Sequence, residues 1–285
     1  MTPEDHTPTA DADQRPRASG LIERENYKLD PNIKREVLNP DVFVDKLQRA
    51  VSFQIATIDD EPNILEFLLH EHARQEPMAS VSGLIKKEFE HAEAAYRQAI
   101  RGHLSDGLTI MIVDNGYLCG VSFSSVRELR QNKTSGQTYQ FKEDYGKELK
   151  SLPIPAPRLN RILTFKRALE DAIPYFLPDD VRFYVCIDFL SVHSDYAHCT
   201  FGKSLVQETF KRTALLGISY VCIVCTSAAA LKIAIQLLLH PATHLEFSRF
   251  VCNGRQVFPD KLTDGGTGAT LFVNNVNEFV SVIPQ

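Results

Sequence analysis

A strand, a short polar loop and a helix follow one another in the third quarter of the chain. Residues 182–192 form an apolar run that predicts a buried strand. An amphipathic helix is predicted from about Phe201 to Leu216. The free amides and the dipole at a helix start make this arrangement a natural place to hold phosphate. The loop has one glycine, Gly202, where phosphate-binding loops often have several, so this pattern fits either a phosphate site or a simple turn.

The rest of the chain alternates strands and helices around this unit. The hairpin is the clearest element, because Asn115-Gly116 separates two apolar runs. Before the central unit, the predicted elements are a strand at 51–58, helices at about 64–74 and 81–104, the hairpin at 108–126 and a helix at 159–177. After the central unit, they are a strand at 220–225, a helix at 228–239 and strands at 245–252 and 269–273. This order predicts the α/β class, with a central mixed sheet and helices on both faces.

The N-terminal fifth differs in composition from the remainder. Residues 1–19 are rich in Pro, Thr, Asp and Ala, which predicts disorder. We therefore divide the chain into a flexible extension at 1–50, with a short helix near Val42–Val51, and one domain at 51–285. A polar insertion is expected within that domain at about 128–178.

Charge and hydropathy limit the partners of the chain. The net charge of −5 argues against nucleic acid, because neutralising a phosphate backbone needs a basic face. No apolar stretch reaches the ~18–20 residues that cross a bilayer. The first thirty residues lack the apolar centre of a signal peptide. We expect a cytoplasmic protein without a membrane or nucleic-acid partner, and the sequence leaves its oligomeric state open.

The cysteines and histidines do not form a metal or redox pattern. Cys222 and Cys225 spell C-x-x-C, but on a predicted strand they face opposite ways. A redox pair needs a turn at a helix start. His70 and His72 are two apart on a predicted helix and do not share a face. We expect buried reduced thiols and no metal site.

Three short motifs and the order of elements resemble one known superfamily. Gln75-Glu76-Pro77 follows the first helix, Leu190-Ser191-Val192 ends the central strand, and Cys225-Thr226-Ser227 follows the next strand. Over about residues 51–275 the chain resembles the GNAT superfamily of acetyl-CoA-dependent N-acetyltransferases, and among them the arylalkylamine enzymes of invertebrates. The resemblance implies a GNAT-like fold, acetyl-CoA as co-substrate and a small aryl- or alkylamine as acceptor.

The phosphate loop departs from the superfamily pattern Gln/Arg-x-x-Gly-x-Gly/Ala. The matching positions here are Ala197, Thr200 and Gly202. Backbone amides survive such changes, but a threonine held at positive φ costs about 1–3 kcal/mol. The resemblance assigns acetyl-CoA binding to the strand end and the loop: Leu190, Ser191, Val192, His198, Cys199, Thr200, Phe201, Gly202 and Lys203.

The resemblance also implies two catalytic residues. Glu76 matches the position of a catalytic glutamate and would accept a proton from the amine. Thr226 matches the first of two assisting serines, whereas the second position is Ala230. Two structural alternatives stay open: Glu76 as a solvated loop acid, and Thr226 with Ser227 as caps of the following helix.

Three functions therefore compete. The first is acetyl transfer from acetyl-CoA to a small amine. The second is a catalytically silent protein of the same fold that binds acyl-CoA weakly or not at all. The third is an interaction scaffold that contacts a partner through residues 1–50.

Overall fold

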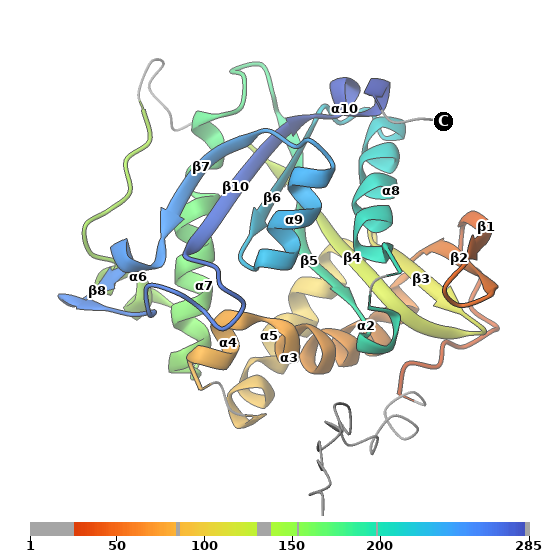
Figure 1. Ribbon diagram of the computed structural model, residues 1–285, viewed down its shortest axis with the longest axis horizontal. Helices are drawn as coiled ribbons and strands as arrows, with labels where there is room; N and C mark the ends of the chain where they lie inside the picture. Colours follow the sequence, from red (N-terminus) through yellow and green to blue (C-terminus); the bar gives the residue numbers. More distant parts are fainter. Residues whose placement is uncertain (1–25, 84–85, 130–137, 153, 198, 283–285) are drawn as a thin grey trace, which may run out of the picture.

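The computed structural model describes residues 26–83, 86–129, 138–152, 154–197 and 199–282. An eight-stranded sheet runs through the molecule in the order β1-β2-β3-β4-β5-β6-β10-β7 (Figure 1). Its strands are β1 Val37–Val44, β2 Arg49–Ile55, β3 Ile110–Asp114, β4 Tyr117–Glu128, β5 Phe183–Val192, β6 Tyr220–Cys225, β7 Pro241–Glu246 and β10 Gly268–Asn275. Strands β1 to β5 pair antiparallel, β5 and β6 pair parallel, and β10 pairs antiparallel with both β6 and β7. The predicted mixed sheet is confirmed.

Helices cover both faces of this sheet. They are α2 Glu61–Phe67, α3 Ala73–Gln75, α4 Pro77–Val81, α5 Lys86–Leu104, α6 Gly146–Ser151, α7 Pro157–Glu170, α8 Phe201–Leu215, α9 Ala228–Gln236 and α10 Val276–Val282. Successive side chains of β5 and β6 face opposite sides of the sheet and so belong to two different cores. Val185 and Val221 pack with α8 and α9, whereas Cys186 and Cys222 pack with α7. No helix in the described part of the chain combines the length and apolar character needed to cross a membrane.

The sheet begins earlier in the chain than the sequence suggested. β1 lies inside the predicted extension and pairs with β2, and the upstream side chains of Tyr27 and Leu29 are 3% and 5% exposed. The predicted helix near Val42–Val51 is wrong, because these residues end β1, turn and start β2, with Val42 opposite Val51. From residue 26 onward the segment belongs to the folded domain, and residues 1–25 lie outside the described residues.

The predicted hairpin turn and the helix predicted at 64–74 are present in the structure. Asn115 and Gly116 have φ of 51° and 82° and join β3 to β4, which confirms the hairpin. The helix predicted at 64–74 is a continuous run of α2, a π-helical turn at Leu68–His72 and α3. The strand predicted at 245–252 is wrong in its bounds, because β7 ends at Glu246 and a turn precedes the two-residue β8 Val251–Cys252, which pairs with β9 Arg255–Gln256.

β5 and β6 separate at one end. Their parallel pairing stops at Ile187 and Ile223, although β5 runs on to Val192. At the same level Asp188 is an extra residue in the pairing of β5 with β4, a bulge that bends the strand. The edge of β5 that faces β6 is therefore open to other groups beyond Ile187.

Candidate active site

Glu76 is the N-cap of helix α4. The residue before a proline is driven to an extended conformation, and Glu76 has ψ of 112° before Pro77, which ends α3 and turns the chain into α4. One oxygen, Oε1, accepts a hydrogen bond from the Met78 amide at 3.4 Å. The side chain is 10% exposed, so Glu76 is a buried carboxylate rather than a solvated loop acid.

Thr226 lies at the end of β6 and contacts this carboxylate. Its hydroxyl donates to Glu76 Oε2 at 3.0 Å, across 150 positions of the sequence. The cap of α9 is Ser227, whose hydroxyl accepts from the Ala230 amide at 3.2 Å. The structure thus brings the two predicted catalytic residues together and assigns the capping role to Ser227 alone.

Burial sets the electrostatics around Glu76. It raises the pKa of Glu76, and Lys166, the Thr226 hydroxyl and the Met78 amide oppose that rise. Burial and then Lys166 lower the pKa of His72 to about 3, so the ring is neutral near pH 7; its Nε2 lies 4.0 Å from Glu76 Oε2. A carboxylate with a raised pKa beside a neutral imidazole is suited to accepting a proton.

Two adjoining cavities lead to this carboxylate. The smaller, of about 40 Å³, is lined by Glu76, His72 and mostly apolar side chains. The larger, of about 740 Å³, is open and charged. Both are lined by Tyr96, Leu163, Lys166 and Phe189. We call the small cavity the throat and the large one the mouth; together they could hold a small elongated molecule whose end reaches Glu76.

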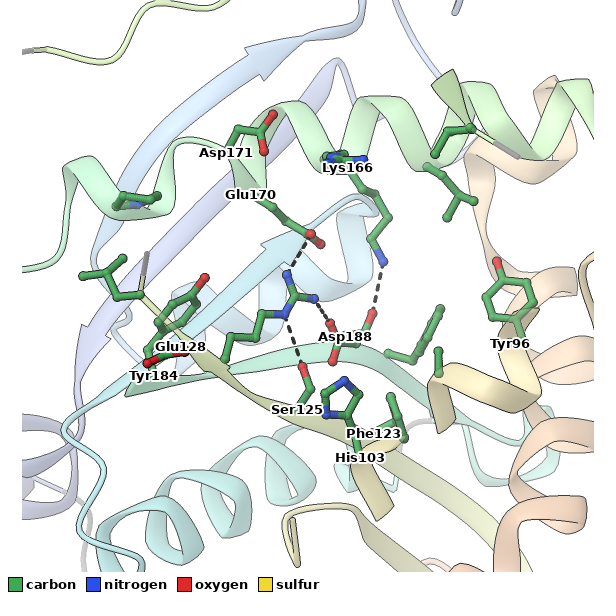
Figure 2. Close-up of a pocket in the computed structure, with 18 of the residues that line it drawn as sticks. Tyr96, His103, Phe123, Ser125, Glu128, Lys166, Glu170, Asp171, Tyr184 and Asp188 are labelled. Atoms are coloured by element: carbon green, nitrogen blue, oxygen red, sulfur yellow. Dashed lines mark hydrogen bonds and ion pairs between the residues drawn. The ribbon is translucent and has the colours of Figure 1, made fainter. Parts of the chain in front are cut away.

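A charged network forms one wall of the mouth (Figure 2). The Arg127 guanidinium donates to Glu170 at 2.9 Å, to Ser125 at 3.2 Å and to the Asp188 carboxylate. These bonds fix both carboxylates at the point where β5 bulges. Burial raises the pKa of Asp188, and Arg127 opposes that rise.

The strand end at residues 190–192 borders the opening between β5 and β6. Leu190 and Val192 pack toward α8, so Ser191 faces the opposite side of the sheet. The Gln75 side chain donates to the Val192 carbonyl at 2.9 Å. The Ser191 hydroxyl is buried without a hydrogen-bond partner among the residues that the structure describes. The hydrogen bond from Gln75 holds the segment that carries Glu76 against the end of β5.

The loop before α8 places backbone amides at the start of the helix. Thr200 has φ of 60°, the strained case foreseen from the sequence, and its hydroxyl donates to the Cys199 carbonyl at 2.6 Å instead of capping the helix. The first helical bond runs from the Ser204 amide to the Thr200 carbonyl. The amides of residues 201–203 therefore have no acceptor within the helix.

The side chains of this loop take different places. Cys199 and Phe201 are buried in the core, where Phe201 stacks on Tyr196 at 5.8 Å between ring centroids. Lys203 is half-buried, and His198 lies outside the described residues. Gly202 packs against α9: a Cβ added there would lie 2.8 Å from Ile233 Cδ1. A larger residue at this position would require the end of the Ile233 side chain to move, and the backbone angle of Gly202 makes no demand for glycine.

Two lysines near these residues were missed by the sequence reasoning. The Lys46 ammonium donates to the Ala197 carbonyl at 2.7 Å, and so places a cation at the loop position where the superfamily has Gln or Arg. Nothing in the sequence connects these residues, which are 151 positions apart. Lys166 had a signal, because it interrupts the apolar stripe that includes Ile162, Leu163 and Leu169. Among the described residues, no group of three His, Cys, Asp or Glu side chains could hold a metal ion.

Neither a protein-family model nor a curated protein sequence matches the chain. Solved structures do. Arylalkylamine N-acetyltransferase 2 from Aedes aegypti is 16% identical and has a TM-score of 0.62, over 80% of this chain and 99% of that one. A Drosophila melanogaster polyamine N-acetyltransferase, described as forming N-acetylagmatine, is 14% identical with a TM-score of 0.58, over 79% and 99%. The C-terminal condensation domain of Ebony, solved with β-alanyl-dopamine, is 8% identical with a TM-score of 0.60, over 79% and 98%. The predicted GNAT-like fold is confirmed.

Proposed function

We propose that this protein is an N-acetyltransferase that transfers the acetyl group of acetyl-CoA to a primary amine, with a small aryl- or alkylamine as acceptor. The observation that carries the proposal is the hydrogen bond between Thr226 and the buried carboxylate of Glu76, beside the open end of β5 and β6. Solved structures of this fold that are named N-acetyltransferases support the reaction class.

Glu76 is the base in the proposed reaction. Acceptor amines are protonated near pH 7, so one proton must leave before the nitrogen can attack. The raised pKa of Glu76 brings its basicity closer to that of the amine. Thr226 and the Met78 amide each bond one carboxylate oxygen and hold the group in place.

The thioester would lie along the open edge of β5. The amine nitrogen forms a bond to the carbonyl carbon, and the carbon–sulfur bond then breaks. Backbone N–H groups of residues 190–192 on that edge would stabilise the negative charge that develops on the carbonyl oxygen. The nitrogen loses a second proton as the amide forms. The departing thiolate takes up one of the two protons that the ammonium gives up, and the other passes from Glu76 to water.

The pyrophosphate of acetyl-CoA would bind at the start of α8. Support comes from the amides of residues 201–203, the positive end of the helix dipole, and the ammonium groups of Lys46 and Lys203. In this proposal Lys46 replaces the basic side chain that Ala197 lacks.

A second candidate is a protein of this fold that does not use CoA. The contact of Ile233 with Gly202 favours it, because it narrows the space between α8 and α9 next to the loop. One of the solved structures with this fold is named a condensation domain rather than an acetyltransferase.

Product analysis distinguishes the two candidates. Purified protein is incubated with acetyl-CoA and one amine in each reaction: tyramine, dopamine or agmatine. Both the N-acetylamine and the free CoA thiol are quantified. The proposal expects equal amounts of the two products with at least one amine. Melting with and without 1 mM acetyl-CoA is measured in parallel: absence of both product and stabilisation would leave only the second candidate.

A further inference from the structure

Lys166 occupies the junction between the throat and the mouth. Its ammonium donates to the Asp188 carbonyl at 3.1 Å (Figure 2). The same ammonium lies 4.8 Å from the centroid of the Phe189 ring. A carbonyl oxygen and an aromatic face are typical partners of an alkylammonium. Among the ion pairs of the described residues, none joins Lys166 to a carboxylate within 4.0 Å. Its positive charge therefore interacts electrostatically with any charged group of an acceptor that lies at the junction.

The two cavities differ in the charges that line them. The throat has one carboxylate, Glu76, and one cation, Lys166. His72 also lines the throat and is neutral near pH 7, because burial lowers its pKa to about 3. The mouth shares Lys166 and adds four carboxylates and two further cations: Glu128, Glu170, Asp171, Asp188, Arg127 and Arg167. Among the described residues that line the throat, Lys166 is therefore the cation that a bound chain meets.

We propose that Lys166 restricts the acceptor to monoamines with an uncharged body and excludes short diamines. This inference rests on the proposed function. An acceptor whose amine reaches Glu76 has its chain in the throat, beside Leu68, Leu159 and Phe189. A short diamine that fills the throat extends its second ammonium toward the junction, which Lys166 lines. Like charges this close, in a partly apolar cavity, repel strongly enough to reduce binding on the order of 10-fold or more.

A matched pair of substrates isolates the effect of the second charge. Butylamine and putrescine have the same carbon chain and differ only in one ammonium. The ratio of their kcat/KM values is measured at one pH for the wild type, for Lys166→Met, which keeps the length of the side chain, and for Lys166→Arg, which keeps the charge. Because the ratio is taken within one variant, any change in Glu76 ionisation cancels.

The wild type is expected to favour butylamine by about 10-fold or more, which corresponds to about 1.4 kcal/mol. Lys166→Met is expected to bring the ratio to within about 3-fold, and Lys166→Arg to retain the preference. Arg167→Met is the control, since Arg167 lies on the same helix and lines the mouth but not the throat.

Two results would overturn the inference while leaving the proposed function intact: a wild type that prefers putrescine, or a Lys166→Met variant with the wild-type ratio. Acetylation of no amine at all would instead overturn the proposed function, and the inference with it. Melting temperatures of the variants show whether a lost preference reflects unfolding.

Discussion

Replacing Thr226 by valine should shift the pH dependence of acetyl transfer. The substitution keeps the shape of the side chain and removes the hydroxyl that donates to Glu76 Oε2 at 3.0 Å. A hydrogen bond to a charged group contributes about 1.5–3 kcal/mol. Since 1.36 kcal/mol corresponds to one pH unit, ionisation of Glu76 in the variant should require a pH about 1–2 units higher.

The assay is the pH profile of kcat/KM for one amine at saturating acetyl-CoA. Glu76 accepts a proton only when ionised, so its ionisation determines the acid limb. In Thr226→Val that limb should move upward by about 1–2 pH units, while the rate at high pH stays within a few-fold of the wild type. Thr226→Ser keeps the hydroxyl and should keep the limb.

Ser227→Ala provides the matched control. It removes the cap of α9 and should cost about 0.5–2 kcal/mol of stability without moving the limb. If Thr226→Val lowers the rate equally at every pH, the Thr226 hydroxyl does not act through the ionisation of Glu76, and the predicted shift of the acid limb is wrong.

Three further predictions concern Glu76, Lys46 and Gly202. The pKa of Glu76 is raised above its ordinary 4.5 in the folded protein, so the contribution of Glu76 to stability falls as pH rises through the raised pKa. The melting temperature of Glu76→Gln minus that of the wild type should therefore increase with pH above about 4.5. A difference that stays constant with pH would contradict this prediction. Lys46→Ala should weaken acetyl-CoA binding about 10-fold in calorimetry, the loss of one charge-assisted contact, whereas Lys211→Ala, whose lysine pairs with Glu208, should leave it unchanged. Gly202→Ala should lower the free energy of unfolding in urea by about 1 kcal/mol, the low end of the cost of overpacking, because the end of the Ile233 side chain can move. Ile233→Val should recover part of that loss, and strictly additive effects would show that the two residues do not touch.

The sequence predicted the parts of the fold that short-range physics decides. The Asn115-Gly116 turn and the strand predicted from the apolar run at residues 182–192 depend on neighbours in the chain, and both are confirmed. The order of these elements was enough to predict a mixed sheet, because strands and helices that alternate along the chain can bury their apolar faces in few ways.

The errors came from segments whose structure depends on distant residues. β1 pairs with β2, and Tyr27 and Leu29 are buried by packing with α2 and the hairpin, so the charged composition of residues 26–50 hid their place in the domain. Composition reports the average polarity of a segment and not which of its residues find a partner.

The site was predicted in part. Glu76 and Thr226 were chosen separately, and their direct hydrogen bond follows only from the fold. The roles of Lys46 and Lys166 were not foreseen, because each reaches its position through a contact with the backbone of a residue far along the chain, at Ala197 and Asp188. A lysine within an apolar helical stripe is nevertheless visible in a sequence, and Lys166 could have been singled out on that ground.

In the proposed reaction, the Glu76 carboxylate removes the proton from an amine that then attacks acetyl-CoA. The most direct measurement is kcat/KM for tyramine in the wild type and in Glu76→Gln, at a pH where the wild type is fully active. We expect a loss of about 100- to 10,000-fold, with an unchanged dissociation constant for acetyl-CoA. Equal rates in the two proteins would show that Glu76 is not the base.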